Sequence, residues 1–198
     1  MSMNVSLLGT PRVLVDGQEL VFPYRKAEGL FYYLCLKRSV SRDEAIGVFW
    51  ADCAETSARK NLRDAIYHLK KLLGEDVVCS EGNNRISLRR DRIDSIDYDE
   101  ITDENILERY TGDFLGYFYI KNCMEFEDWA TDVREELQRR YQRALKRRID
   151  AVAVGGQVKP ILDCAGMLLR SRNTEEKPYL KLLEGLLDLG APLSTYWG

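Results

Sequence analysis

The chain has 198 residues, of which 45% are hydrophobic and 31% are charged. This length can bury one large or two small cores, and the formal net charge of −3 conceals an uneven distribution. Residues 1–93 contain 15 Lys and Arg against 12 Asp and Glu, whereas residues 94–198 contain 14 against 20. The first half is therefore the better candidate for binding a polyanion.

The five cysteines form no C-x-x-C pair and the chain has a single histidine, so we expect no metal site and no cofactor. Free thiols of this kind indicate a reducing cytoplasm. The N-terminus lacks the basic and apolar segments of a signal peptide, and no run approaches the roughly 20 apolar residues of a membrane helix. We therefore expect a cytoplasmic protein without membrane association.

The first 22 residues are typical of short strands. Residues 5–9, 12–17 and 18–22 are rich in Val, Leu and Phe, and Thr10-Pro11 and Asp16-Gly17 interrupt them. Asp-Gly between apolar runs is a strong hairpin signal, so the sequence predicts a three-stranded antiparallel meander.

Helical periodicity begins at residue 25. Apolar residues recur over 25–39 at three- and four-residue spacing, at Ala27, Leu30, Phe31, Leu34 and Cys35. Ser41 and Glu44 have the spacing of a capping box, which predicts a short helix that continues through Trp50.

The stretch ETSARKNLRDAIYHLKKLLGED (55–76) predicts an amphipathic helix. Its apolar side carries Ala58, Leu62, Ala65, Ile66, Leu69, Leu72 and Leu73. Thr56 or Ser57 can cap its start, and Gly74 can end it. Residues 77–80 and 85–90 then predict a β-hairpin with an Asn-containing tip. Two helices joined by a short turn, the second basic and followed by a hairpin, have the order of a winged helix-turn-helix.

The remaining chain is predicted to be all-α. Residues 101–118 indicate a helix followed by an aromatic, glycine-punctuated turn. A long helix is predicted over 124–154, with apolar residues from Phe126 to Ile149 on one face and Gly155-Gly156 at its end. Two further helices are predicted over 158–171 and 174–190, the second capped by Thr174 and closed at Gly190. Their short connections favour an antiparallel bundle or a TPR-like stack of helical hairpins.

The chain resembles a known family in the residues VSLLGTPRVLVDGQELVFPYRKAEGLFYYLCL, SRDEAIGVFW and SARKNLRDAIYHLKKLLGED. These resemble the N-terminal DNA-binding domain of SARP-type bacterial transcriptional activators, relatives of the OmpR winged-helix group. The following YTGDFLGYFYIKNCMEFEDWATDVREEL resembles the start of their bacterial transcriptional activator domain.

The resemblance implies a DNA-binding domain over residues 2–93 and a helical activator domain over 94–198. It also implies activation of transcription through the sigma and alpha subunits of RNA polymerase, binding of adjacent copies to direct repeats, and a possible homodimer. The helical domain of this family is usually longer, so we expect the chain to be a fragment of a larger regulator.

The candidate DNA-binding residues lie on the polar side of the 55–74 helix and at the hairpin tip. We expect Arg59, Lys60 and Arg63 to contact bases or nearby phosphates, because Arg suits bidentate contact with guanine. Tyr67, Lys70 and Lys71 are expected at the DNA backbone, and Asp64 to orient a neighbouring cation. A solvated polar face is the alternative. The tip residues Asn83, Asn84 and Arg85 suit phosphates or the minor groove, although a simple Asn-rich turn explains them almost as well.

Three other features have structural explanations. His68 lies beside the apolar stripe, where a lone histidine is more often a packing residue than a ligand. The basic run RRYQRALKRR (139–148) is interpreted as the outer face of an amphipathic helix paired with Glu135 and Glu136. The sequence contains none of the common phosphate-loop, hydrolase or dinucleotide motifs, so we expect no enzyme.

Two alternatives remain open. The first is a protein-interaction module whose winged helix no longer binds DNA. The second is an enzyme of unfamiliar type, for which a concave polar pocket with perturbed carboxylates in residues 94–198 is the expected sign.

Overall fold

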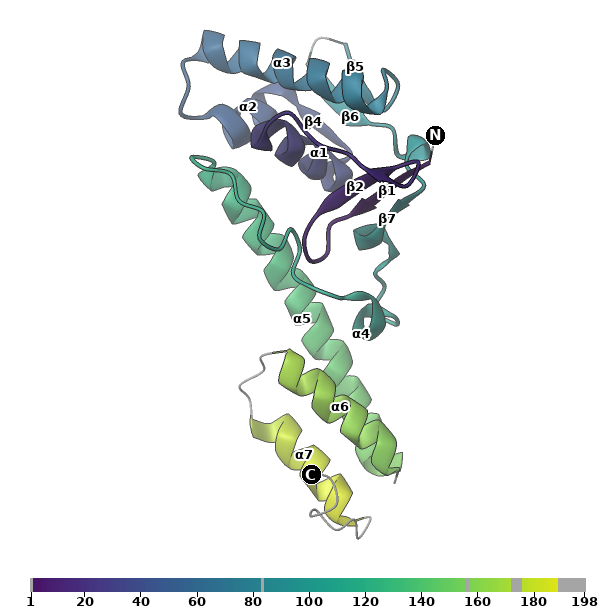
Figure 1. Cartoon of the computed structure of the whole chain (residues 1–198). Helices are drawn as coiled ribbons and strands as arrows, with labels where there is room; N and C mark the ends of the chain where they lie inside the picture. The colour runs from purple at the N-terminus through teal and green to yellow at the C-terminus, as the bar shows by residue number, and fades with distance from the viewer. Residues whose placement is uncertain (1, 83, 156, 172–175, 189–198) are drawn as a thin grey trace. The chain divides into compact units, whose positions relative to one another are not determined.

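The computed structural model describes residues 2–82, 84–155, 157–171 and 176–188 (Figure 1). Its elements follow in the order β1 (Met3–Ser6), β2 (Arg12–Val15), β3 (Gln18–Glu19), α1 (Arg25–Lys37), β4 (Ser39–Ser41), α2 (Arg42–Trp50), α3 (Glu55–Leu73), β5 (Val78–Glu81), β6 (Arg85–Leu88), η1 (Arg90–Arg92), β7 (Ser95–Ile96), η2 (Asp97–Glu100), α4 (Ile106–Arg109), α5 (Met124–Gly155), α6 (Val158–Arg170) and α7 (Glu176–Asp188). The chain is thus a mixture of helices and small sheets.

Two compact units divide the chain. The first contains Met1–Glu100 and Thr111–Glu135, and the second contains Ile101–Tyr110 and Glu136–Gly198. The division falls within α5, so residues 111–135 belong with the N-terminal elements. The predicted domain boundary at residue 93 does not coincide with this division, and it remains a prediction.

The N-terminal sheet has the strand order β3-β2-β1-β7. The meander is as predicted, since β1 and β2 pair antiparallel with Val5 opposite Val13, and β2 pairs antiparallel with β3. The prediction of a purely antiparallel sheet is wrong, because β7 pairs parallel to β1. Asp94 fixes this added strand: its carboxylate accepts from the backbone N–H of Met3 at 2.6 Å, and its own N–H donates to the Met3 carbonyl at 2.8 Å.

The elements α1, β4, α2, α3, β5 and β6 follow one another in the order that a winged helix-turn-helix requires. A second sheet has the strand order β4-β6-β5. The apolar residues predicted for α1 are fully buried. Ser41 caps α2 as predicted and accepts from the Glu44 N–H at 3.0 Å. The Glu44 carboxylate accepts from the Tyr33 hydroxyl at 2.9 Å.

Residues 101–118 form much less helix than predicted, since only α4 is helical. Leu115 and Tyr117 have φ values of 49° and 63°, which a right-handed helix excludes. The segment is instead held against the N-terminal strand region, because the N–H of Leu115 donates to the Leu7 carbonyl at 2.7 Å. A Cβ at Gly112 would lie 2.9 Å from the Gly9 Cα, closer than Cβ atoms come to backbone, so this close approach needs glycine.

The start of α5 belongs to the core of the first unit. The Trp129 ring lies 4.6 Å from Tyr33, and the Phe126 ring lies 5.3 Å from Phe49, measured between centroids. The Arg134 guanidinium donates to the Phe114 carbonyl at 2.7 Å. These contacts explain why residues 111–135 are part of this unit.

The second unit consists of the rest of α5, α6 and α7, with residues 101–110. Its buried side chains come from all three helices, from α4 and from the residue Ile101: Ile101, Ile106, Leu137, Tyr141, Ala144, Leu145, Ile149, Ile161, Cys164, Leu168, Leu182 and Leu186. The helices α6 and α7 pack against each other. The predicted Thr174 cap and Gly190 end lie outside the described residues, as does Gly156, and the TPR-like stack remains a prediction. None of the described helices is long and apolar enough to cross a membrane.

Candidate nucleic-acid interface

The helix α3 buries the apolar side that the sequence predicts. Ala58, Leu62, Ala65, Ile66, Leu69 and Leu73 are buried, and Leu72 is half-buried. Gly74 ends the helix with φ 104°, and its N–H donates to the Lys70 carbonyl. The predicted caps are wrong: Ala54 is the N-cap and supplies no side-chain hydrogen bond, while Thr56 and Ser57 are exposed in the first turn.

The opposite side of α3 presents its cations to solvent. Arg59, Lys60, Arg63 and Lys71 are exposed, and Tyr67 among them keeps 61% of its surface accessible. Lys60, Arg63 and Lys71 form no ion pair within the part of the chain that the structure describes. A cation without a carboxylate partner can meet a phosphate without first breaking another contact.

Two cations of α3 do have carboxylate partners. The Arg59 guanidinium lies 3.0 Å from Glu55 and 3.4 Å from Asp43 of α2. Lys70 is half-buried, and its ammonium lies 3.3 Å from Glu75. Exposed pairs of this kind contribute about 0.2–1 kcal/mol, so they orient the two side chains without blocking them. Asp64 forms no ion pair with any described residue, so the expectation that it orients a neighbouring cation is not met.

The hairpin β5–β6 places Asn84 and Arg85 at its exposed end, whereas Asn83 lies outside the described residues. Arg85 is fixed across the sheet, since its Nε donates to the Ser39 hydroxyl at 3.1 Å and its Nη2 to the Ser39 carbonyl at 3.3 Å. One cation beside the hairpin was not predicted. Arg42 at the start of α2 donates from Nη2 to the Ser80 hydroxyl at 3.2 Å and from its backbone N–H to the Asn84 carbonyl at 2.8 Å.

His68 is a packing residue, as predicted. Its ring is half-buried and lies 5.9 Å from Tyr24 and 5.6 Å from Tyr67, measured between centroids. Burial raises the pKa of the Tyr24 phenol, and the nearby Asp64 carboxylate raises it further. The aromatic contacts brace the last turns of α3 against the segment that precedes α1.

A surface hollow lies at the N-terminal sheet, away from the α3 face. Its lining includes Ser6, Arg12, Glu19, Asp97 and Thr111. Burial raises the pKa of Asp97, while bonds from backbone N–H groups oppose this effect. The carboxylate accepts from Leu7 at 2.7 Å and from Leu8 at 3.1 Å. Asp97 therefore has a structural task, which is to hold the end of β1.

Comparison with known proteins gives a likeness in fold. No family model matches the chain, and no curated protein matches its sequence. Its structure is similar to Mycobacterium tuberculosis EmbR in complex with a low-affinity phosphopeptide, with a TM-score of 0.55 and 16% sequence identity. The likeness covers 96% of this chain but only 66% of the EmbR chain. At this identity the comparison shows the fold alone.

Proposed function

We propose that the chain is a DNA-binding transcription regulator of the SARP type. The observation that carries this proposal is the exposed side of α3, where Lys60, Arg63 and Lys71 have no carboxylate partner among the described residues. The order of α2, α3 and the β5–β6 hairpin is that of a winged helix-turn-helix, in which the second helix enters the major groove. The fold likeness to EmbR supports the same class of protein.

In this proposal the N-terminal half of α3 reads bases and its C-terminal half holds the DNA backbone. Arg59, Lys60 and Arg63 contact base edges or adjacent phosphates. Tyr67, Lys70 and Lys71 contact the backbone, and the hairpin adds Asn83, Asn84 and Arg85. We add Arg42 to this set, because it is hydrogen-bonded to both the hairpin strand and the hairpin tip.

The finer parts of the proposal follow from the sequence resemblance. Residues 2–93 form the DNA-binding domain and residues 94–198 the helical activator domain. The protein works in the cytoplasm, activates transcription by recruiting RNA polymerase through its sigma and alpha subunits, and binds direct repeats as adjacent copies or as a homodimer. Recognition of DNA, and not a chemical reaction, is its task.

Salt dependence of DNA binding tests the proposal. Each neutralised phosphate contributes about −0.9 to the slope of log Kobs against log salt concentration. We expect a clear negative slope for the chain with sheared duplex DNA. The double variant Lys60→Gln/Arg63→Gln should reduce its magnitude by about 1.8 if both side chains contact phosphates. The control Lys37→Gln/Lys121→Gln removes two exposed charges elsewhere in the first unit and should leave the slope unchanged. A flat response of the unaltered chain would contradict DNA binding.

One observation favours the alternative of a protein-interaction module. Tyr117, Tyr119 and Met124 are 98%, 62% and 77% exposed, and Tyr and Met are residue types enriched in protein interfaces. A flat salt response, together with a protein partner whose binding is lost in Tyr117→Ala/Tyr119→Ala, would replace the DNA-binding proposal with this alternative.

A further inference from the structure

A second group of cations lies on α5 within the second unit. Residues 139–148 contain six Lys and Arg and no Asp or Glu. Leu137, Tyr141, Leu145 and Ile149 face the core of the unit. Because α-helical residues advance by about 100° each, one set of cations lies on the side opposite to these apolar residues. We call this set the α5 stripe, and it consists of Arg139, Arg140, Arg143, Lys146 and Arg147.

The charge of the two compact units agrees with a functional role for the α5 stripe. The second unit contains 12 Lys and Arg against 10 Asp and Glu, a balance of +2, whereas the first contains 17 against 22, a balance of −5. Division at residue 93 gives the opposite ranking, because it assigns two acidic stretches, residues 94–100 and 111–135, to the helical half. The more basic unit is therefore the one that carries the α5 stripe.

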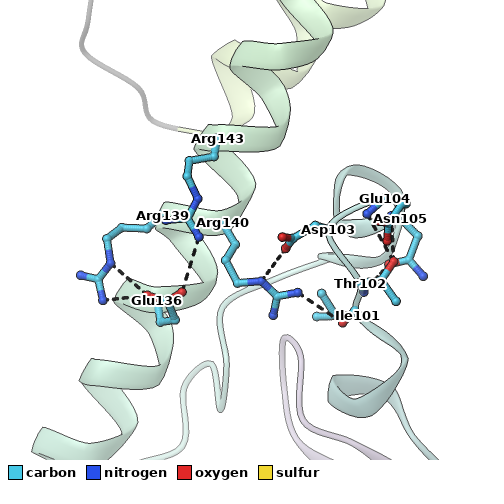
Figure 2. A network of polar contacts seen from close by, with 9 residues as sticks. All are labelled: Ile101, Thr102, Asp103, Glu104, Asn105, Glu136, Arg139, Arg140 and Arg143. Carbon is cyan, nitrogen blue, oxygen red and sulfur yellow. Dashed lines mark hydrogen bonds and ion pairs between the residues drawn. The ribbon is translucent and has the colours of Figure 1, made fainter.

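Figure 2 shows how carboxylates hold part of the α5 stripe. Arg140 donates from Nε to Asp103 at 2.9 Å and from Nη2 to the Ile101 carbonyl at 3.4 Å. Glu136 lies 3.1 Å from the Arg139 guanidinium and 3.6 Å from that of Arg143. Glu136 thus pairs with the basic run as the sequence predicts, but it serves only two of the cations.

The C-terminal end of the α5 stripe stays uncompensated. Lys146 and Arg147 are exposed and form no ion pair within the described ranges. Arg147 lies close enough to lower the pKa of Asp103 and of Glu104 electrostatically. Even when Glu136, Asp103 and Glu104 are all counted against the five cations, the stripe keeps a balance of +2.

The length of the α5 stripe suits a nucleic-acid backbone. From Arg139 to Arg147 the helix rises by about 12 Å, at 1.5 Å per residue. One strand of duplex DNA carries a phosphate about every 3.4 Å along its axis, so the stripe can face about three or four phosphates. Arg and Lys without interleaved carboxylates favour such a polyanion over an acidic protein surface, whose charges are sparser.

We propose that the α5 stripe is a second contact surface for the phosphates of duplex DNA. This inference rests on the proposed function, to which it adds a binding surface outside the winged helix. Phosphates carry no sequence information, so the stripe adds affinity and salt dependence but no base preference. Lys146 and Arg147 contribute most, because the other three cations already hold carboxylates.

The double variant Lys146→Gln/Arg147→Gln tests this inference in the full chain with sheared duplex DNA. We expect the log–log salt slope to lose about 1.8 in magnitude, corresponding to two phosphate contacts. The matched control Lys159→Gln/Lys177→Gln removes two exposed charges from α6 and α7 of the same unit and should leave the slope unchanged. Urea unfolding of both variants checks that they fold. Equal slopes for the two variants would overturn the inference. If both slopes fall, only the net charge matters, and if neither falls, Lys146 and Arg147 do not contact phosphates.

The two proposals fail in different ways. A slope reduced by Lys60→Gln/Arg63→Gln but not by Lys146→Gln/Arg147→Gln leaves the α3 interface in place and removes the α5 stripe. The reverse result removes the α3 interface and keeps the stripe. If polyglutamate binding and not DNA binding depends on Lys146 and Arg147, the stripe is a docking surface for an acidic protein, and the inference about DNA is wrong.

Discussion

The helices α3 and α5 both bury an apolar side and expose cations on the other, yet they hold those cations differently. In α3, Lys60, Arg63 and Lys71 have no carboxylate partner among the described residues. In α5, Arg140 is fastened to Asp103 at 2.9 Å, a residue from a separate segment of the chain. The number of cations along the sequence does not distinguish unpaired cations from cations held by a carboxylate. The partner that each cation has in the structure does distinguish them.

The presence or absence of a carboxylate partner predicts different roles for the unpaired cations of α3 and for Arg140 of α5. An unpaired cation on α3 is available to a ligand, so its removal should affect binding and leave the fold intact. Arg140 connects α5 to residues 101–110, so its removal should affect the local structure first. The α5 stripe contains both kinds of cation, and its uncompensated end at Lys146 and Arg147 is the part that resembles α3.

The largest effects are expected on the buried sides, where the two helices should behave alike. Leu62 of α3 is 1% exposed and Leu145 of α5 is fully buried. Truncation of either to Ala should lower the free energy of unfolding by about 2–5 kcal/mol, through lost apolar burial and the cavity left behind. Denaturant titration measures this change. Lys71→Ala, at an exposed position of α3, is the control and should change stability by less than about 0.5 kcal/mol.

The second largest effect concerns the exposed side of α3. Arg63→Ala should weaken binding to a site selected from random duplex DNA by about 1–3 kcal/mol, if Arg63 reads a base. Its stability should not change, because the side chain is exposed and unpaired among the described residues. Lys37→Ala, an exposed cation on α1, should leave the affinity unaltered. Unchanged affinity of Arg63→Ala for the selected site would remove this residue from the interface.

A smaller effect is expected at Arg59. Asp43→Asn removes one of the two carboxylates that hold the Arg59 guanidinium, as well as a negative charge near the expected path of the DNA backbone. Affinity for sheared duplex should rise by a factor of about 1.4 to 5, which corresponds to the roughly 0.2–1 kcal/mol of an exposed pair. Asp128→Asn serves as the control in a fluorescence titration. A loss of affinity in Asp43→Asn would show that Asp43 positions Arg59 productively and does not restrain it.

The smallest effect is an acid dependence of the Arg140 contact. Arg140 lowers the pKa of Asp103 below its usual value of 3.8. A carboxyl group whose pKa is lower in the folded state stabilises the fold above its unfolded pKa and loses this contribution as the pH falls. The protection of the amides in residues 101–110, measured as the exchange rate relative to the intrinsic rate at the same pH, should therefore fall on acidification below about pH 4. Asp103→Asn should exchange faster at neutral pH and lose this pH dependence. Identical exchange in the two proteins would show that other contacts hold the segment.

Local signals made much of the first unit predictable. The period of α3, its end at Gly74, the Ser41 cap of α2 and the hairpin turn each depend on a few neighbouring residues. The strand β7 was missed because it has only two residues and pairs with a strand some 90 positions away. The turn at residues 111–118 was only partly predicted, because no sequence pattern marks Leu115 and Tyr117 as left-handed.

The candidate site was also predictable where it depends on neighbouring residues, and not where it depends on contacts between elements. Helical periodicity alone predicts that Lys60, Arg63 and Lys71 are exposed. The partner of Arg59 on α2 was not predictable, because the contact with Asp43 depends on how α2 packs against α3. Arg42 was missed for a similar reason, since its contact with Ser80 joins residues 38 positions apart in the sequence.

A titration of sheared duplex DNA at increasing salt concentration, with the intact chain, tests the central claim most directly. If the unpaired cations of α3 bind phosphates, the logarithm of the binding constant falls linearly with the logarithm of salt concentration, and Lys60→Gln/Arg63→Gln gives a shallower line. An affinity that does not respond to salt, or equal slopes for this variant and the unaltered chain, would contradict the account.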